Sequence, residues 1–397
     1  MSYITLEKAL LRSVFKIEIP YLAQSFHIPN HFTLSSSMSV LAAITVLAIL
    51  ILVHELGHFL AARSQGIYVN RFSLGFGPTL WKYQGSQTEY AVRAFPLGGF
   101  VGFPDDDPDS NISPDDPNLL RNRPILDRAV VVSAGVIANL VFAYLVLVVL
   151  FGIVGIPDLQ YEPGVVVQPD TEQSLAYEAG IRKGDIIIAI QDKELKASKN
   201  AVTLLKTEIE NHPNQPVYLK IQRQQENLSL YITPQLKDSK GRIGIKLIEN
   251  ATQIYHRPLN IQEVFSTAAN KFQQLVVRTF QGFGQLITNF QNTADKLAGP
   301  VKIVEAGAKL AATDSTNLLF FAAIISINLA VINILPLPAL DGGQLAFLLI
   351  EGLRGKPLPN RIQENVMQTG LVLLLGLGIF LIVKDTSQLE WVQKLFQ

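Results

Sequence analysis

Val53-His54-Glu55-Leu56-Gly57-His58-Phe59 ends a long apolar run and contains the pattern His-Glu-x-x-His. Residues four apart on a helix lie one turn apart on the same face, so the imidazoles of His54 and His58 can bind one metal ion. Glu55 lies beside them, where its carboxylate can accept a proton from water at that metal. No Asp, Glu, Lys or Arg occurs from residue 19 to residue 53. The stretch therefore predicts a metal site at the end of a membrane helix.

The composition supports a membrane protein. The chain has 397 residues, of which 48% are hydrophobic and only 17% charged, which is more apolar than an ordinary soluble domain. A net charge of zero gives no reason to expect nucleic-acid binding. There is no cysteine, so disulfides and thiolate ligands are excluded, and a metal would need His and carboxylate ligands.

Four apolar stretches predict four transmembrane helices, at residues 38–63, 129–157, 315–340 and 365–383. The first carries the His-Glu-x-x-His motif, so we interpret it as a retained span and not as a cleaved signal peptide. Residues 1–37 form an N-terminal tail, which is either a short amphipathic interfacial helix or unordered. The fold class expected is a polytopic α-helical membrane protein.

The loop at residues 64–128 contains glycine- and aromatic-rich pieces at 72–78 and 88–103 that read as strands. We expect a membrane-associated β-hairpin beside the metal site, with an ordinary cytosolic hairpin as the alternative. Basic residues in the two short loops predict that residues 64–128 and 344–364 are cytoplasmic, with the long insert and both termini outside.

The insert at residues 158–314 holds several strand-like runs, followed by apolar residues at helical spacing from 261 to 290. That helix lies either against the membrane or on the small domain. We expect an N-terminal tail (1–37), a first membrane half (38–157) and a small α/β domain (158–250). An amphipathic linker helix (251–314), a second membrane half (315–385) and a C-terminal tail (386–397) follow.

A third candidate ligand comes from Asn333-Ile-Leu-Pro336-Leu-Pro338-Ala-Leu-Asp341-Gly-Gly343. Its prolines and glycines forbid a regular helix, and a broken helix at membrane depth is tolerated only around a protein-lined cavity. A carboxylate at that break is costly unless it is paired or binds a metal, although Asp341 can also cap the next helix. The topology brings Asp341 to the same leaflet as His54 and His58, which together predict a zinc site with an open position for water.

These motifs resemble the site-2 protease family of intramembrane zinc metalloproteases, in its bacterial regulator-of-sigma-E protease branch. The resemblance covers residues 38–385 and includes the segments at 54–58, 72–78, 96–100, 133–139, 298–302 and 333–343. The chain departs from the family pattern at Val136, where proline is usual, and at Gln344, where histidine often follows the aspartate.

The resemblance implies one PDZ domain in the insert, because Ala179-Gly-Ile-Arg-Lys-Gly-Asp185 is typical of protease-associated PDZ domains. Such a domain either binds an extended peptide or filters bulky substrates. Asn333 is expected to hydrogen-bond an unwound substrate backbone. Substrate binding is expected at this residue and at Pro336, Pro338, Gly98 and Gly99.

We therefore predict peptide-bond hydrolysis inside the membrane, with Zn²⁺ on His54, His58 and Asp341 and with Glu55 as the catalytic base. The alternatives are a transporter or channel, and a PDZ-bearing membrane sensor with a structural metal site. The expected partners are the lipid bilayer and single-span membrane proteins, such as anti-sigma-factor-like proteins or signal-peptide remnants. The expected location is a bacterial plasma membrane or an organelle membrane of bacterial descent.

Overall fold

The computed structural model describes residues 35–107, 110–224, 226–237, 239–289 and 297–388. They divide into two compact units, one made by residues 157–256 and the other by the chain on either side. The predicted N-terminal tail lies outside the described residues up to residue 34, as does the C-terminal tail from residue 389.

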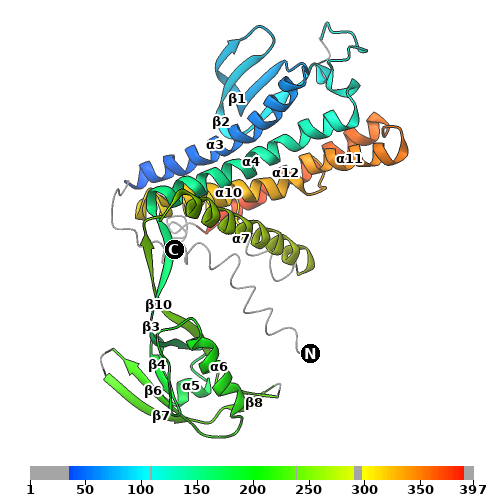
Figure 1. Ribbon diagram of the computed structural model, residues 1–397. Helices are drawn as coiled ribbons and strands as arrows, with labels where there is room; N and C mark the ends of the chain where they lie inside the picture. Colours follow the sequence, from blue (N-terminus) through cyan, green and yellow to red (C-terminus); the bar gives the residue numbers. More distant parts are fainter. Residues whose placement is uncertain (1–34, 108–109, 225, 238, 290–296, 389–397) are drawn as a thin grey trace. The chain divides into compact units, whose positions relative to one another are not determined.

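Where the structure describes the unit outside residues 157–256, four helices are long and apolar enough to cross a membrane (Figure 1). They are α3 (Ser36–Ser64), α4 (Ile125–Val154), α10 (Asn317–Ile334) and α12 (Asn360–Ser387). Each includes most of one predicted span. Helices satisfy their own backbone hydrogen bonds, which is what a segment surrounded by lipid requires. The polytopic fold is confirmed.

The helices α3 and α4 approach each other closely through small residues. A Cβ atom on Gly57 of α3 would overlap the main chain of Ala134 and lie 2.8 Å from the Cβ atom of Ala138, both on α4. Lipid tails provide no hydrophobic force between helices, so packing of this kind depends on close backbone approach. The glycine inside the His-Glu-x-x-His motif is therefore a point of close contact between the first two spans.

Three further α-helices belong to the described part of this unit. They are α7 (Ile261–Thr288), α9 (Pro300–Thr313) and α11 (Asp341–Arg354). The predicted amphipathic helix is α7, which packs against α4 and α10, with Tyr144 of α4 between the rings of Phe265 and Phe272. Helix α9 packs on α3, and α11 packs on α4.

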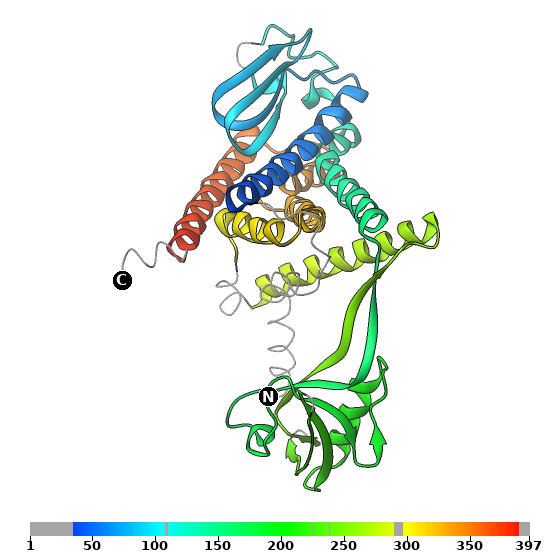
Figure 2. The ribbon, with the colours of Figure 1, turned by 90° about the vertical axis from the view of Figure 1, so that its left-hand side faces the viewer.

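A small sheet lies beside α3, made by β1 (Arg71–Gln84) and β2 (Glu89–Gly102) (Figure 2). Residues 79–84 and 89–93 form an antiparallel hairpin, and its first strand lies outside the pieces predicted at 72–78 and 88–103. Residues 71–74 extend it by pairing with 89–92 on one side and with 99–102 on the other. The chain thus reverses direction three times, which leaves 99–102 at one edge of the sheet. Short 3₁₀ helices at Pro104–Asp106 and Leu120–Asn122 follow.

The unit at residues 157–256 consists of β-strands and two α-helices. The sheet order is β10-β3-β4-β6-β7, with β5 on β4, and β8 pairs with β9 separately. The elements are β3 (Ile156–Pro169), α5 (Leu175–Glu178), β4 (Ile186–Ile190), β5 (Lys193–Glu194), α6 (Ala201–Asn211), β6 (Val217–Arg223), β7 (Glu226–Ile232), β8 (Gln235–Lys237), β9 (Lys240–Arg242) and β10 (Ile245–His256).

The core of this unit explains its strand pattern. Alternating residues of β6 face inward, together with Ile187 and Ile190 of β4 and Leu205 of α6. The predicted hairpin at 217–232 is confirmed by the pairing of β6 with β7. Helix α6 was not predicted, although Ala201, Leu205 and Ile209 recur at the four-residue spacing of a buried helix face.

One ion pair inside this unit links the turn before β4 to the end of β6. The carboxylate of Asp185 is almost fully buried and accepts hydrogen bonds from Nε and Nη2 of Arg223, both at 2.8 Å. Burial alone raises the pKa of Asp185, but the bonds from Arg223 and from the backbone N–H of Arg182 outweigh it, so the pKa lies below its usual value.

This pKa shift makes the pair sensitive to acid. A lowered pKa in the folded state means that the pair stabilises the fold above the unfolded pKa of about 4, and that this contribution is lost as the pH falls through the folded pKa. We expect Arg223→Gln to destabilise the unit by about 1–3 kcal/mol at pH 7 and by clearly less near pH 3. Hydrogen exchange of the β4 and β6 amides in the full chain measures this.

The matched control is Lys193→Gln. Lys193 pairs with Glu208 on the surface of the same unit, where an exposed pair contributes less than about 1 kcal/mol. Equal exchange in the Arg223→Gln and Lys193→Gln variants at pH 7 would contradict this account of the Asp185 pair.

Candidate metal centre

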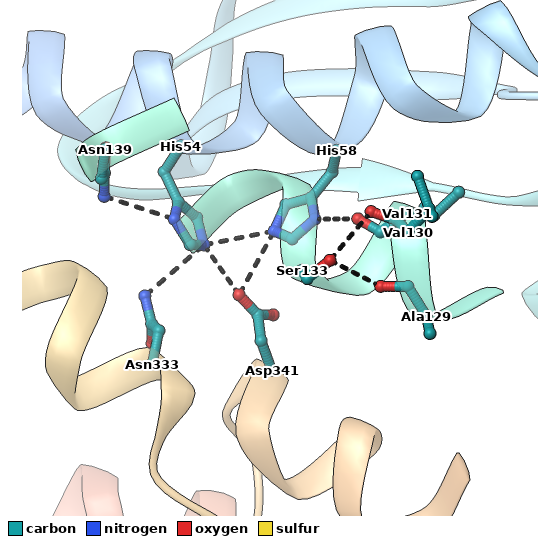
Figure 3. A network of polar contacts seen from close by, with 9 residues as sticks. All are labelled: His54, His58, Ala129, Val130, Val131, Ser133, Asn139, Asn333 and Asp341. Atoms are coloured by element: carbon teal, nitrogen blue, oxygen red, sulfur yellow. Dashed lines mark hydrogen bonds and ion pairs between the residues drawn. The ribbon is translucent and has the colours of Figure 1, made fainter. Parts of the chain in front are cut away.

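Three side chains from two helices converge on one point (Figure 3). Atom Nε2 of His54 lies 3.2 Å from Nε2 of His58 and 3.2 Å from Oδ2 of Asp341. Nε2 of His58 lies 3.4 Å from the same carboxylate oxygen. The histidines come from one face of α3, as their spacing predicts, and Asp341 is the first residue of α11. The structure therefore brings the three predicted ligands together.

The loop between α10 and α11 carries Asp341 to the histidines. Helix α10 ends at Ile334 and α11 begins at Asp341, so the predicted break in the third span is confirmed. A Cβ atom on Gly342 would overlap the carbonyl groups of residues 334 and 335, and one on Gly343 would overlap that of Leu337. Both glycines are thus required by close backbone contact. Leu340 occupies the cap position, and Asp341 lies in the first turn, where the helix dipole still favours its negative charge.

Helix α4 forms the wall behind the two histidines. Nδ1 of His58 donates a hydrogen bond to the backbone carbonyl of Val131 at 2.8 Å, because a carbonyl can only accept. This leaves the lone pair of Nε2 directed at the convergence point. A Cβ atom on Gly135, one turn further along α4, would overlap the ring of His58 and lie 2.8 Å from Cε1 of His54. Only glycine fits there.

Asn139, a further turn along α4, contacts the other histidine. Its side-chain amide lies against Nδ1 of His54, with Nδ2 at 3.3 Å, and its buried Oδ1 has no hydrogen-bond partner in the described part of the chain. Turning the amide by 180° makes Oδ1 the acceptor for Nδ1–H of His54, which pairs these two atoms and frees Nε2 as a ligand. Ser326 of α10 donates a hydrogen bond to the backbone carbonyl of Asn139 at 2.8 Å.

The donor set suits zinc. A tetrahedral ion with ligands at about 2.0–2.1 Å has ligand atoms about 3.3–3.4 Å apart, close to the separations among His54, His58 and Asp341. Oδ2 of Asp341 is buried and makes no hydrogen bond with the described residues, an arrangement that a cation would satisfy. Two histidines and one carboxylate are also a ligand set typical of catalytic zinc, which keeps one position open.

Glu55 lies next to the ligands and against the β1–β2 sheet. A Cβ atom on Gly99 would lie 2.8 Å from Cγ of Glu55, so the absence of a side chain lets this edge strand approach the carboxylate. Among the described residues, the Glu55 carboxylate has no hydrogen-bond partner. Its oxygens are therefore available to a water molecule.

The predicted substrate-binding residues lie at different distances from this centre. Nδ2 of Asn333 is 3.5 Å from Nε2 of His54. Pro336 and Pro338 lie in the loop before Asp341, and Pro338 packs against Gly370 of α12. Gly98 has φ +141° and packs on the ring of Phe76, so the structure gives it a packing role, and its predicted contact with substrate stays a prediction.

Sequence reasoning missed the contribution of α4. The segment at 133–139 entered only through the family resemblance, and Val131, Gly135 and Asn139 were not singled out as neighbours of the histidines. Their spacing of four residues, the same as that of His54 and His58, is the signal that a facing helix leaves in the sequence.

Comparisons with known proteins agree with this geometry. The model of peptidase family M50 matches residues 42–377. A Nostoc sp. protein, named provisionally as a zinc metalloprotease, is 64% identical over 91% of this chain and 100% of its own length. The membrane metalloprotease ARASP, chloroplastic, of Arabidopsis thaliana is 47% identical over 91% of this chain and 82% of its own length. A similarly named Synechocystis sp. protein is 56% identical over 90% of this chain and 97% of its own length.

We expect Asp341→Asn to lose bound metal. The substitution keeps the shape of the side chain but removes the negative charge and the better ligand oxygen, so zinc affinity should fall by more than about 100-fold. Chelator competition on the detergent-solubilised protein measures this. The exposed Asp192→Asn variant is the matched control and should keep its zinc. Equal zinc affinity in the two variants would remove Asp341 from the ligand set.

Proposed function

Because this chain belongs to peptidase family M50, we propose that it hydrolyses peptide bonds of membrane-spanning segments at the centre formed by His54, His58 and Asp341. It is a multi-pass integral membrane protein and a zinc metalloprotease. The observation that carries the proposal is the convergence of the three ligand atoms beside Glu55, on helices apolar enough to span a bilayer. Zinc bound there supplies a Lewis acid that polarises the scissile carbonyl and lowers the pKa of water.

Glu55 is the proton carrier of the reaction. Its carboxylate takes a proton from the attacking water and returns it to the nitrogen of the leaving amine. The histidines keep their Nδ1 protons on the α4 wall, His58 on the carbonyl of Val131 and His54 on the amide of Asn139, so they do not compete for that proton.

Two groups are placed to hold an extended substrate. Asn333 directs its amide N–H toward the ligand atoms, where it can donate a hydrogen bond to a substrate carbonyl as negative charge develops on it. The edge strand at residues 99–102 pairs with 71–74 on one side only among the described residues. An unwound substrate segment can add to its free edge beside Glu55, which supports the role predicted for Gly99.

The unit at residues 157–256 offers a second binding surface. A groove of about 740 Å³ lies between α6 and the segment that leads into β10, lined on one wall by Val202, Lys206 and Ile209 and on the other by Ile243 and Ile245. Strand β10 pairs only with β3 in the described sheet, so its other edge is available. We propose that this unit is a PDZ-like domain that binds an extended peptide by strand addition.

The expected protein partners follow from these proposals. The substrates we propose are single-span membrane proteins, anti-sigma-factor-like proteins or signal-peptide remnants among them, cleaved within their apolar segment. A sensor with a purely structural metal site is the rival function. Glu55 favours the protease, because a structural zinc site does not need an unpaired carboxylate beside it.

The Glu55→Gln variant distinguishes the protease from the sensor with a structural metal site. The amide cannot carry the proton, so cleavage of a single-span model substrate in proteoliposomes should fall by about 10²–10⁴-fold, while zinc content stays at the wild-type level. Gel analysis of the cleavage products and metal analysis of the same sample give the two results. Retention of full cleavage by the variant would reject Glu55 as the proton carrier.

Tryptophan substitutions on α6 test whether the groove binds peptides. Lys206→Trp places an indole over the groove, whereas Thr207→Trp places one on an exposed position of α6 outside it. We expect the full-length Lys206→Trp protein to retain at least about 10-fold less of a pool of random-sequence peptides than the Thr207→Trp protein. Equal retention by the two variants would leave only a size-filter role for this unit.

A further inference from the structure

A second polar link connects the helices of the metal centre, away from the ligands. Arg128, in the first turn of α4, donates hydrogen bonds from Nη1 and Nη2 to the two carboxylate oxygens of Glu351 on α11, at 3.0 and 2.5 Å. The side chains are only 17% and 14% exposed. Nε of Arg128 also donates to the backbone carbonyl of Arg123 at 3.1 Å, which fixes the guanidinium plane.

Few residues of helix α11 are buried. Among its described residues, only Gly342, Gly343 and Leu348 are buried, whereas Leu353 is 82% exposed. The helix begins at Asp341 and contains Glu351 near its other end, about 15 Å further along the axis at 1.5 Å per residue. The ion pair is therefore the polar contact that fixes the end of α11 opposite to the metal ligand.

Helix α4 holds both sides of the metal centre. The carbonyl of Val131, one turn after Arg128, accepts the hydrogen bond from His58. Arg128 itself holds the helix that begins with Asp341. The distance between the histidine ligands and the carboxylate ligand is thus set by two contacts made from neighbouring turns of one helix.

Given the proposed ligand role of Asp341, we propose that the Arg128–Glu351 ion pair is a positioning device for zinc binding, and that it sets where the Asp341 carboxylate lies relative to His54 and His58. A two-point fork between guanidinium and carboxylate fixes both distance and orientation. Partly buried ion pairs add little net stability, because desolvation offsets their attraction, and they are better suited to fixing register. Metal ligands must be held to within about 0.5 Å, so loss of one end of α11 is enough to weaken binding.

The first test is zinc affinity, measured by chelator competition on the detergent-solubilised full chain. Glu351→Gln and Arg128→Gln should each raise the zinc dissociation constant by roughly 10-fold, the effect of losing an outer contact of a metal site. The charge swap Arg128→Glu/Glu351→Arg should restore the affinity to within about threefold. The exposed Glu364→Gln and Arg361→Gln variants, at the start of α12, are the matched controls and should bind zinc as the wild type does.

The second test asks whether the pair acts through Asp341. In an Asp341→Asn background, Glu351→Gln should cause no further loss of the residual zinc affinity, because the carboxylate that it positions is gone. An equal loss in both backgrounds would overturn the proposal. So would Glu351→Gln variants that melt at a lower temperature but bind zinc normally, since that result assigns the pair to stability alone.

These outcomes are separate from those of the proposed function. If Asp341→Asn itself keeps its zinc, the ligand assignment fails and the positioning role fails with it. If Asp341→Asn loses zinc and Glu351→Gln does not, only the positioning role fails. Should either glutamine variant not fold, Arg128→Lys keeps the charge without the two-point fork, and wild-type zinc affinity in that variant would overturn the proposal.

Discussion

The close approach of α3 and α4 is the constraint on which the metal centre depends. Gly57 lets the main chain of α4 lie against α3, and Gly135 lets it lie against the rings of His54 and His58. At that separation the carbonyl of Val131 and the amide of Asn139 can hold the outer nitrogen of each ring. A helix pair spaced by larger side chains would leave the rings free to rotate. The geometry of the ligands is therefore a consequence of helix packing.

The membrane explains why the other half of the centre is irregular. A carboxylate within a continuous third span would be energetically unfavourable, because an unpaired charge in hydrocarbon is costly. The chain instead stops α10 at Ile334, turns through Pro336 and Pro338, and starts a new helix at Asp341. Protein covers the second half of the turn, where Pro338 packs against Gly370 and the backbone N–H of Ala339 lies against Met367, whereas Pro336 and Leu337 are exposed.

Local patterns in the sequence predicted the ligands and the spans, because these depend on spacing within one helix. His54 and His58 are four residues apart, and the four charge-free runs became the four long apolar helices. Contacts between distant segments were not predictable in this way. The pairing of Arg128 with Glu351 joins residues more than two hundred positions apart, and neither residue type specifies its partner. Helix α6 was overlooked because its apolar positions are interrupted by exposed ones and lie between two runs of strand.

X-ray absorption at the zinc K edge of the purified full chain tests the central claim most directly, because it reports the atoms that surround the metal. The account predicts four-coordinate zinc with two imidazole nitrogens and two oxygens, one from Asp341 and one from water, at about 2.0–2.2 Å. In Asp341→Asn protein reloaded with excess zinc, the carboxylate contribution should disappear while both imidazoles remain. A spectrum with fewer than two imidazoles, or one unchanged by Asp341→Asn, would contradict the proposed centre.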